Sequence, residues 1–138
     1  MIDKMNVRVY AAILKEGKVM ALHEEYVGQQ LLKFPGGGLE LGEGVLECLQ
    51  RELEEELNIK VKNIEHLYTQ ENFLASKFRA GEQLLSIYYI AEMTDENDLL
   101  IMDPCIEKIE WISLDTEENP FPLPIDKIAF KKLKQRFL

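Results

Sequence analysis

Residues 37–59 read GGLELGEGVLECLQRELEEELNI and change from a glycine-rich loop to a helical pattern. Leucines recur at a spacing near 3.6 residues, which places them on one face of an α-helix. They are Leu46, Leu49, Leu53 and Leu57. The pattern predicts a helix over Val45–Leu57. Residues 31–38, LLKFPGGG, predict a short apolar strand that ends in a loop, because Pro-Gly-Gly-Gly breaks regular structure.

Three glutamates of this helix, Glu52, Glu55 and Glu56, border its apolar face. At about 100° per residue, Glu52 lies within reach of the other two, so the three carboxylates can converge on one point. Converging carboxylate oxygens are the ligands that hard divalent cations such as Mg²⁺ or Mn²⁺ prefer. Taken alone, the same glutamates are better explained by a charged, solvated helix face, since like-charged pairs at this spacing cost only about 0.2 to 0.5 kcal/mol each.

The order of the residues around these glutamates adds weight to a metal site. They match the pattern G-x5-E-x7-R-E-U-x-E-E-x-G-U, where U is aliphatic, everywhere except at Asn58. The matching residues are Gly37, Glu43, Arg51, Glu52, Leu53, Glu55, Glu56 and Ile59. The stretch from Gly37 to Ile59 therefore resembles the signature box of the Nudix hydrolase family. Asn tolerates the left-handed conformation that the missing glycine would adopt, so we expect the turn to be preserved.

The resemblance implies an α/β fold, a Nudix-type α/β/α sandwich with a mixed sheet and a loop-helix-loop catalytic motif. It also implies that Mg²⁺ (or Mn²⁺) is the cofactor, held by the glutamates of the helix and by Gly37, whose backbone can approach a cation closely. Arg51 would position a carboxylate of the box, most plausibly that of Glu43. The general base would be Glu55 or a glutamate from a later loop. The candidates in or near those loops are Glu82, Glu96, Glu107 and Glu110.

The remaining sequence predicts strands on both sides of the box and a second helix at the end. The strands are expected at 6–14 and 19–25, joined as a hairpin, at 61–73 and 84–93, also able to pair, and at 106–115. Proline-rich residues 119–124 precede a helix over 125–138. Its apolar residues are Ile128, Phe130, Leu133 and Phe137. This spacing favours a helix packed on the protein, with a solvated basic face, over a nucleic-acid-binding tail.

Length and composition limit the remaining alternatives. The 138 residues fit one domain, 1–138, and the formal net charge of −9 argues against nucleic-acid partners. Two cysteines and the lack of a signal peptide or a long apolar run favour a cytoplasmic protein with no membrane partner. Homodimers are common in families of this kind, so a homodimer stays an alternative to a monomer.

The substrate is less well defined than the chemistry. The resemblance implies hydrolysis of the pyrophosphate linkage in a nucleoside diphosphate derivative of the ADP-ribose, nucleotide-sugar or dinucleotide type. A house-cleaning nucleoside triphosphate pyrophosphohydrolase is the alternative, and a non-catalytic nucleotide sensor is a third, against which the intact glutamate set argues. The substrate-binding candidates are Arg8, His23, Lys33 and Phe34, followed by Arg79 for phosphate and by Tyr68, Phe73 and Trp111 for base stacking. Many family members have an arginine where this chain has His23 and Glu24.

Overall fold

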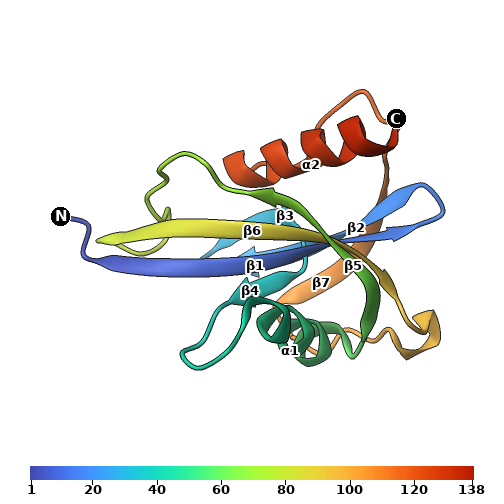
Figure 1. The fold of residues 1–138 in the computed structure, drawn as a ribbon, viewed down its shortest axis with the longest axis horizontal. Helices are drawn as coiled ribbons and strands as arrows, with labels where there is room; N and C mark the ends of the chain where they lie inside the picture. Colours follow the sequence, from blue (N-terminus) through green and yellow to red (C-terminus); the bar gives the residue numbers. More distant parts are fainter.

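The computed structural model describes all 138 residues as a mixed seven-stranded sheet between two helices. The strands are β1 (Lys4–Lys15), β2 (Lys18–Tyr26), β3 (Gln29–Lys33), β4 (Gly36–Gly38), β5 (Val61–Thr69), β6 (Glu82–Met93) and β7 (Ile106–Ser113). The helices are α1 (Val45–Leu57) and α2 (Pro124–Phe137), with one 3-10 turn at Glu96–Asp98. Helix α1 lies on one side of the sheet and α2 on the other (Figure 1). The predicted α/β/α sandwich is confirmed.

Strand β1 occupies the middle of the sheet and pairs with β2, β4 and β6. It pairs in parallel with β6 along most of its length and antiparallel with β4. Strand β6 in turn pairs antiparallel with β5, as the sequence predicts. The predicted hairpin of β1 and β2 is present only at its closed end, where Leu14 pairs with Val19. The rest of β2 leaves β1 and lies between β3 and β7, antiparallel to both.

The predicted loop over Pro-Gly-Gly-Gly is wrong, because Gly36–Gly38 form strand β4. This strand pairs with β1 through Arg8 and Gly38, Val9 and Gly37, and Tyr10 and Gly36. At Gly36, φ is 145° and a Cβ atom would lie 2.1 Å from the carbonyl oxygen of Val9. Glycine is therefore required here because two backbones approach closely, and the same residue type that predicts a turn permits a short strand instead.

Each helix covers its own hydrophobic core. Leu49, Leu53 and Leu57 of α1 pack with Val9, Ala11, Ile13, Met20 and Leu22. Ile125, Ala129, Phe130 and Leu133 of α2 pack with Phe34, Tyr88 and Phe121 on the opposite face. The terminal helix thus packs on the protein as predicted. Leu46 and Phe137 were expected in these apolar faces but are 46% and 47% exposed, because they occupy the first turn of α1 and the last turn of α2, where packing against the sheet stops.

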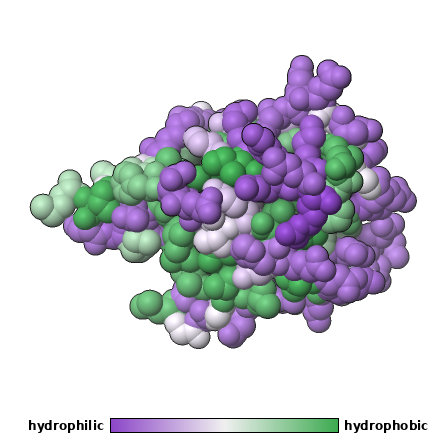
Figure 2. Space-filling model, turned by 45° about the horizontal axis from the view of Figure 1, so that its top comes forward, coloured by the Kyte–Doolittle hydropathy of each residue, from purple (hydrophilic) through white to green (hydrophobic).

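Polar side chains cover most of the surface that Figure 2 presents. An apolar tip protrudes on its left, at the start of β1, where Met1, Ile2 and Met5 are exposed. Neither helix is long and apolar enough to cross a membrane.

Candidate active site

Both ends of α1 are capped by hydrogen bonds or by a specific backbone conformation. At the start, the N–H of Gly44 donates to the Glu47 carboxylate at 3.0 Å. At the end, Asn58 adopts φ 58° and ψ 31°, so the prediction that asparagine replaces the left-handed glycine is confirmed. The Asn58 side chain also donates to the carbonyl of Asp98 at 3.0 Å. The Asn58 contact ties the end of α1 to the segment that precedes β7.

The segment before β7 crosses the C-terminal end of α1. The N–H of Leu100 donates to the carbonyl of Leu57 at 3.0 Å, and the N–H of Met102 donates to the carbonyl of Glu56 at 2.8 Å. Two of the carbonyls that an α-helix leaves unpaired at its end are thereby satisfied. The same crossing places Asp103 beside the glutamates of α1.

Arg51 connects the loop before α1 to the glutamates on it. Its Nε and Nη2 donate to the two oxygens of Glu43 at 2.7 and 2.8 Å, and Nη2 also donates to the carbonyl of Gly38 at 3.0 Å. Its Nη1 donates to Glu52 at 3.0 Å and to Glu55 at 3.3 Å. The hydrogen bonds from Arg51 lower the pKa of Glu43 to about 2. The pairing that the sequence predicts for Arg51 and Glu43 is present, bidentate and fully charged at neutral pH.

Arg51→Lys is expected to lower kcat/KM roughly 10- to 100-fold, because lysine cannot make a bidentate pair and at the same time reach Glu52 and Glu55. Steady-state kinetics on any nucleotide that the protein hydrolyses measures this loss. Arg136→Lys is the matched control, since Arg136 contacts only the carbonyl of His66 on the far side of the protein. Equal activity of the two variants would contradict a positioning role for Arg51.

The three glutamates of α1 open into one cleft, which we call the carboxylate cleft. It has a volume of about 340 Å³ and contains no apolar residue. Its lining residues are Arg8, Glu24, Lys33, Gly36, Gly37, Gly38, Glu52, Glu55, Glu56 and Asp103. The Glu55 side chain is 60% exposed, that of Glu52 17%, and Glu56 is buried. Burial above all, with Glu52, Glu24 and Asp103 nearby, raises the pKa of Glu56 to about 8.

The carboxylate cleft fits a divalent cation by three observations. Glu56 Oε1 is buried and has no hydrogen-bond partner. A Cβ atom at position 37 would lie 2.3 Å from the carboxyl carbon of Glu52, so only glycine allows the backbone this close to the carboxylate. The donors are oxygens throughout, as hard cations prefer. No three acidic, histidine or cysteine side chains are already gathered at ligand distances, so the glutamates must turn inward to hold an ion together.

Cys48 lies next to Gly37 but does not line the carboxylate cleft. Its Sγ is buried and lies 3.9 Å from the carbonyl oxygen of Gly37. Burial raises the pKa of the Cys48 thiol to about 12. The side chain is therefore a buried neutral thiol and not a thiolate ligand.

A second hollow adjoins the carboxylate cleft, and we call it the aromatic cleft. It consists of an outer part of about 230 Å³ and a deeper part of about 270 Å³. The residues that line both parts are Tyr10, Phe78, Leu84, Leu123 and Asp126, with Asn6, Tyr26, Leu31, Ser76 and Arg79 in the outer part and Tyr88 in the deeper one. Tyr26 and Phe78 meet edge to face with centroids 4.7 Å apart. Arg8, Glu24 and Lys33 line the outer part and the carboxylate cleft alike, so the two clefts are continuous.

Two cations lie where the clefts meet. Arg8 donates through Nε to the Tyr10 hydroxyl at 3.0 Å, and Lys33 Nζ lies 3.5 Å from Glu24 Oε2 and 5.7 Å from the centre of the Tyr10 ring. Burial acts to lower the pKa of both cations, but Tyr10 beside both of them, together with Glu24 beside Lys33, outweighs burial and leaves both pKa values raised. Arg8 and Lys33 therefore carry full positive charge at neutral pH.

At the base of the aromatic cleft, the Tyr88 hydroxyl donates to Asp126 at 2.5 Å. Burial raises the pKa of Asp126 from 3.8 to about 6, against the opposing effects of the Tyr88 hydrogen bond and of Lys33 and Arg8. The folded protein therefore holds this proton more tightly than the unfolded chain does. As pH rises from about 4 to about 6, the folded state loses stability relative to the unfolded state, and above pH 6 this loss is complete.

Asp126→Asn is expected to be about 2 kcal/mol more stable than the native protein near pH 7.5 and nearly equal to it near pH 4, because the amide removes the buried charge and still accepts from Tyr88. Denaturant unfolding of both proteins at the two pH values measures the difference. Asp115→Asn, an exposed substitution beside Ser113, is the control. A stability difference that does not change with pH would contradict a raised pKa at Asp126.

Several predicted site residues lie outside these clefts. His23 faces away and contacts Glu110 at 2.7 Å, and Phe34 is completely buried and stacked on Phe121 at 4.4 Å, so neither residue lines a cleft. The reason for His23 is strand alternation, which turns Glu24 toward the cleft instead. The four later glutamates lie in β6, β7 and the 3-10 turn and contact other residues. Glu82 accepts from Asn6, Glu96 pairs with Lys15, Glu107 accepts from Gln30, and Glu110 contacts His23. Tyr68, Phe73 and Trp111 line neither cleft.

The structure adds residues that the sequence analysis missed. They are Asp103, Glu24, Tyr10, Tyr26, Phe78 and Asp126. One signal was available: Asn6, Arg8 and Tyr10 alternate along a strand whose other positions are mostly apolar, which places three polar or aromatic side chains on one face. No comparable pattern marks Asp103.

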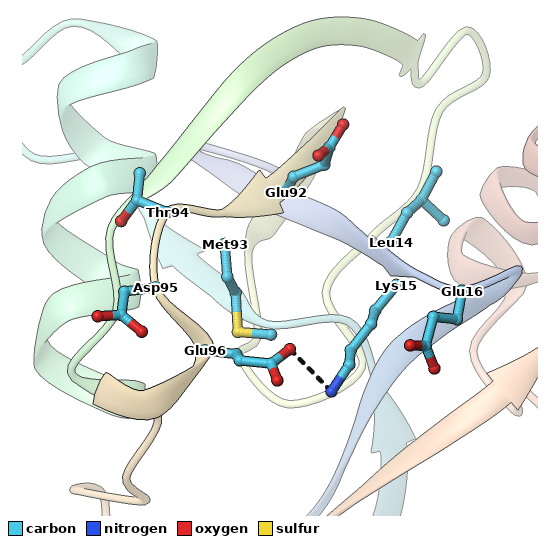
Figure 3. Close-up of a pocket in the computed structure, with 8 residues that line it drawn as sticks. All are labelled: Leu14, Lys15, Glu16, Glu92, Met93, Thr94, Asp95 and Glu96. Carbon is cyan, nitrogen blue, oxygen red and sulfur yellow. Dashed lines mark ion pairs between the residues drawn. The ribbon is translucent and has the colours of Figure 1, made fainter.

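A larger hollow of about 570 Å³, drawn in Figure 3, shares no lining residue with the carboxylate cleft. Its residues are Leu14, Lys15, Glu16, Glu92, Met93, Thr94, Asp95 and Glu96. It is open and mostly polar, and its central contact is an ion pair between Lys15 and Glu96 at 2.9 Å. Size alone therefore does not identify the site, since this hollow lacks the buried unpaired oxygens of the carboxylate cleft.

Comparison with known proteins identifies the family. A sequence model of the NUDIX domain matches residues 4–133. The chain belongs to the Nudix hydrolase family. Solved structures agree in fold. A MutT NUDIX hydrolase from Burkholderia pseudomallei has a TM-score of 0.79 and 22% identity, with 95% of this chain and 99% of that chain covered. A NUDIX hydrolase from Nitrosomonas europaea has a TM-score of 0.77 and 21% identity, with 96% and 90% covered.

A MutT protein from Bacillus halodurans is also similar, with a TM-score of 0.73 and 25% identity over 94% of this chain and 82% of that one. Membership in the Nudix family implies an enzyme that hydrolyses pyrophosphate linkages, and Nudix hydrolases generally use a divalent metal ion. The Nudix box of this chain supplies Glu52, Glu55 and Glu56 to the carboxylate cleft. The family match therefore agrees with the site that the geometry alone indicates.

Proposed function

We propose that this Nudix hydrolase cleaves the pyrophosphate linkage of a nucleotide with the help of Mg²⁺ or Mn²⁺. The observation that carries the proposal is the continuity of the carboxylate cleft with the aromatic cleft through Arg8, Glu24 and Lys33. Phosphates need cations and metal-holding carboxylates, whereas a nucleobase needs aromatic and apolar surface. A nucleotide contains both phosphates and a base, joined by a sugar. It therefore fits a carboxylate cleft that adjoins an aromatic cleft.

Residues of the carboxylate cleft would bind the metal ion and the phosphates. Glu52, Glu55 and Glu56 would hold the cation, which neutralises phosphate charge and lowers the pKa of bound water when present. Gly37 would let the backbone approach it, and Arg51 would keep Glu52 and Glu55 in place. Arg8 and Lys33 would bind the phosphate nearest the nucleoside.

The general base is proposed among the carboxylates that face the cleft. Glu55 is exposed and accepts only one hydrogen bond, from Arg51, so one of its oxygens is free to take a proton from water. Asp103 is the loop carboxylate that lines the cleft, whereas the four later glutamates considered from the sequence do not line it. Comparing kcat of Glu55→Gln with that of Asp103→Asn assigns the role to the residue whose loss lowers kcat more, at saturating metal ion.

Two substrate types remain candidates. The resemblance favours a nucleoside diphosphate derivative such as ADP-ribose, a nucleotide sugar or a dinucleotide. A nucleoside triphosphate is the second candidate, supported by the carboxylate cleft itself, which has no apolar or aromatic lining for a second large group. The end of the substrate beyond the cleaved bond would then be held through its phosphates alone. A homodimer stays a prediction.

The test is a panel of nucleotides incubated with the native protein and Mg²⁺, with products separated by ion-exchange chromatography. ADP-ribose, ADP-glucose, diadenosine polyphosphates and the four ribonucleoside triphosphates represent the candidate types. AMP plus a sugar phosphate would support the first type, and pyrophosphate plus a monophosphate the second. If no compound were hydrolysed while one of them raised the midpoint of thermal unfolding, the protein would be a nucleotide-binding sensor and the proposed function would be wrong.

A further inference from the structure

Glu24 is a buried carboxylate in the wall between the two clefts. The residue is 7% exposed, and its Oε2 has no hydrogen-bond partner. Lys33 Nζ forms an ion pair with the same oxygen at 3.5 Å, which is longer than a good hydrogen bond. A buried carboxylate oxygen without a donor is costly, so proteins seldom leave one unless a ligand completes it. Glu24 therefore indicates a hydrogen-bond donor that the protein itself does not supply.

The neighbours of Glu24 show that its orientation is specific. On either side along β2, His23 is paired with Glu110 and Glu25 is exposed, so only the middle residue of the three faces the clefts. Opposite this point, the pairing of β2 with β7 shifts register between His23 and Glu24. Such irregularities are common beside functional sites, where they redirect side chains.

The position of Glu24 limits what the missing donor can be. Phosphate oxygens are excluded, because they are negatively charged acceptors like the carboxylate itself. The nucleobase is expected deeper in the aromatic cleft, beside Tyr10, Phe78 and Asp126. The part of a nucleotide that lies between its phosphates and its base is the ribose, and ribose hydroxyls are donors.

We propose that Glu24 accepts hydrogen bonds from the 2′- and 3′-hydroxyls of the substrate ribose, so that the enzyme prefers ribonucleotides to 2′-deoxyribonucleotides. The inference rests on the proposed function, because it places phosphates and base in their two clefts. An acidic side chain that binds the ribose 2′-hydroxyl has a physical precedent in dinucleotide-binding folds. Arg8 and Lys33 flank Glu24 and bind the adjacent phosphate, so the carboxylate does not repel the substrate as a whole.

The first experiment needs no variant. The native protein is assayed with Mg²⁺ on matched pairs: ATP and dATP, GTP and dGTP, CTP and dCTP, UTP and dUTP, and ADP-ribose and its 2′-deoxyadenosine analogue. The ribose form of any hydrolysed pair is expected to have a kcat/KM roughly 10- to 100-fold higher, because the deoxy form leaves the Glu24 oxygen unpaired. Equal kcat/KM values would overturn the inference and leave the proposed function standing. If no pair were hydrolysed, the proposed function would fail and the inference with it.

The second experiment assigns the preference to Glu24. Glu24→Ala is expected to bring the ribose and deoxyribose values within about threefold of each other, mainly by slowing the ribose form, and Glu24→Gln to keep part of the preference through its amide oxygen. Glu25→Ala, the exposed neighbour, is the matched control and should keep the native ratio. A native ratio in Glu24→Ala would overturn the inference.

A metal-binding role for Glu24 gives a different result. The affinity for Mn²⁺ is measured by electron paramagnetic resonance on the native protein and on Glu24→Ala, without nucleotide. Ribose recognition predicts equal Mn²⁺ affinity in the two proteins. If the affinity fell in Glu24→Ala and ribose and deoxyribose substrates were slowed equally, Glu24 would be a metal ligand and the inference would be overturned.

Discussion

Glu52→Gln is expected to lower kcat about 10²- to 10³-fold while the protein stays folded, because a metal ion supplies several kcal/mol of transition-state stabilisation and the variant removes a charge that holds it. The Glu52 side chain is 17% exposed, lies against Gly37 and accepts from Arg51 at 3.0 Å. Glutamine keeps the shape and one acceptor oxygen but loses the charge. Steady-state kinetics at rising Mg²⁺ concentration measures the loss, and Mn²⁺ titration without substrate measures the weaker binding.

Glu54→Gln is the matched control for this experiment. Glu54 lies on the same helix, is exposed and does not line the carboxylate cleft. Its variant should keep native kcat and native Mn²⁺ affinity. Native activity in Glu52→Gln, or an equal loss in both variants, would contradict the assignment of the metal site to the cleft side of α1.

Alanine at each of two adjacent glycines of β4 is expected to have a different effect: Gly36→Ala lowers stability, and Gly37→Ala lowers activity. In Gly36→Ala, the new Cβ would lie 2.1 Å from Val9 O and 2.8 Å from Tyr10 Cα, both backbone atoms of the central strand. Backbone cannot move aside, and φ of 145° adds strain. We expect a loss of about 3 kcal/mol or more in the free energy of unfolding, from overpacking and strain together.

In Gly37→Ala, the clash is with the end of a side chain instead. All three nearest atoms belong to the Glu52 carboxylate, at 2.3 to 2.5 Å, and this carboxylate can rotate away. We expect a change of about 1 kcal/mol or less in stability and a loss of activity similar to that of Glu52→Gln. Thermal unfolding and kinetics on both alanine variants check the contrast. An unstable Gly37→Ala or a stable Gly36→Ala would show that β4 does not approach its neighbours as described.

The sequence predicts α1 and its three glutamates well because both depend on residues close together in the chain. Helix periodicity aims Glu52, Glu55 and Glu56 to one side, and the same helix geometry brings Arg51 back toward Glu43. The left-handed end at Asn58 is local in the same sense. These features need no knowledge of which strands pair, so a single stretch of 23 residues carries them.

The substrate side of the site depends on long-range pairing, which the sequence does not express locally. Arg8, Glu24 and Lys33 come together only because β2 leaves β1 after the closed end of the first hairpin and pairs with β3. Phe78 comes from a loop and Asp126 from α2. Asp103 reaches the cleft because the segment before β7 crosses the end of α1. Phe34 shows the converse: an aromatic residue beside the box is a natural stacking candidate, yet it is completely buried in the core beneath α2.

The two amides that close the end of α1 have a practical use. Leu100 and Met102 donate to Leu57 and Glu56, and the next residue is Asp103. Their hydrogen-exchange rates depend on whether this segment is seated on the helix, and fast exchange would mean that it opens often. Hydrogen exchange of these two amides, followed by nuclear magnetic resonance, therefore measures how often one wall of the cleft opens. The measurement needs no substrate.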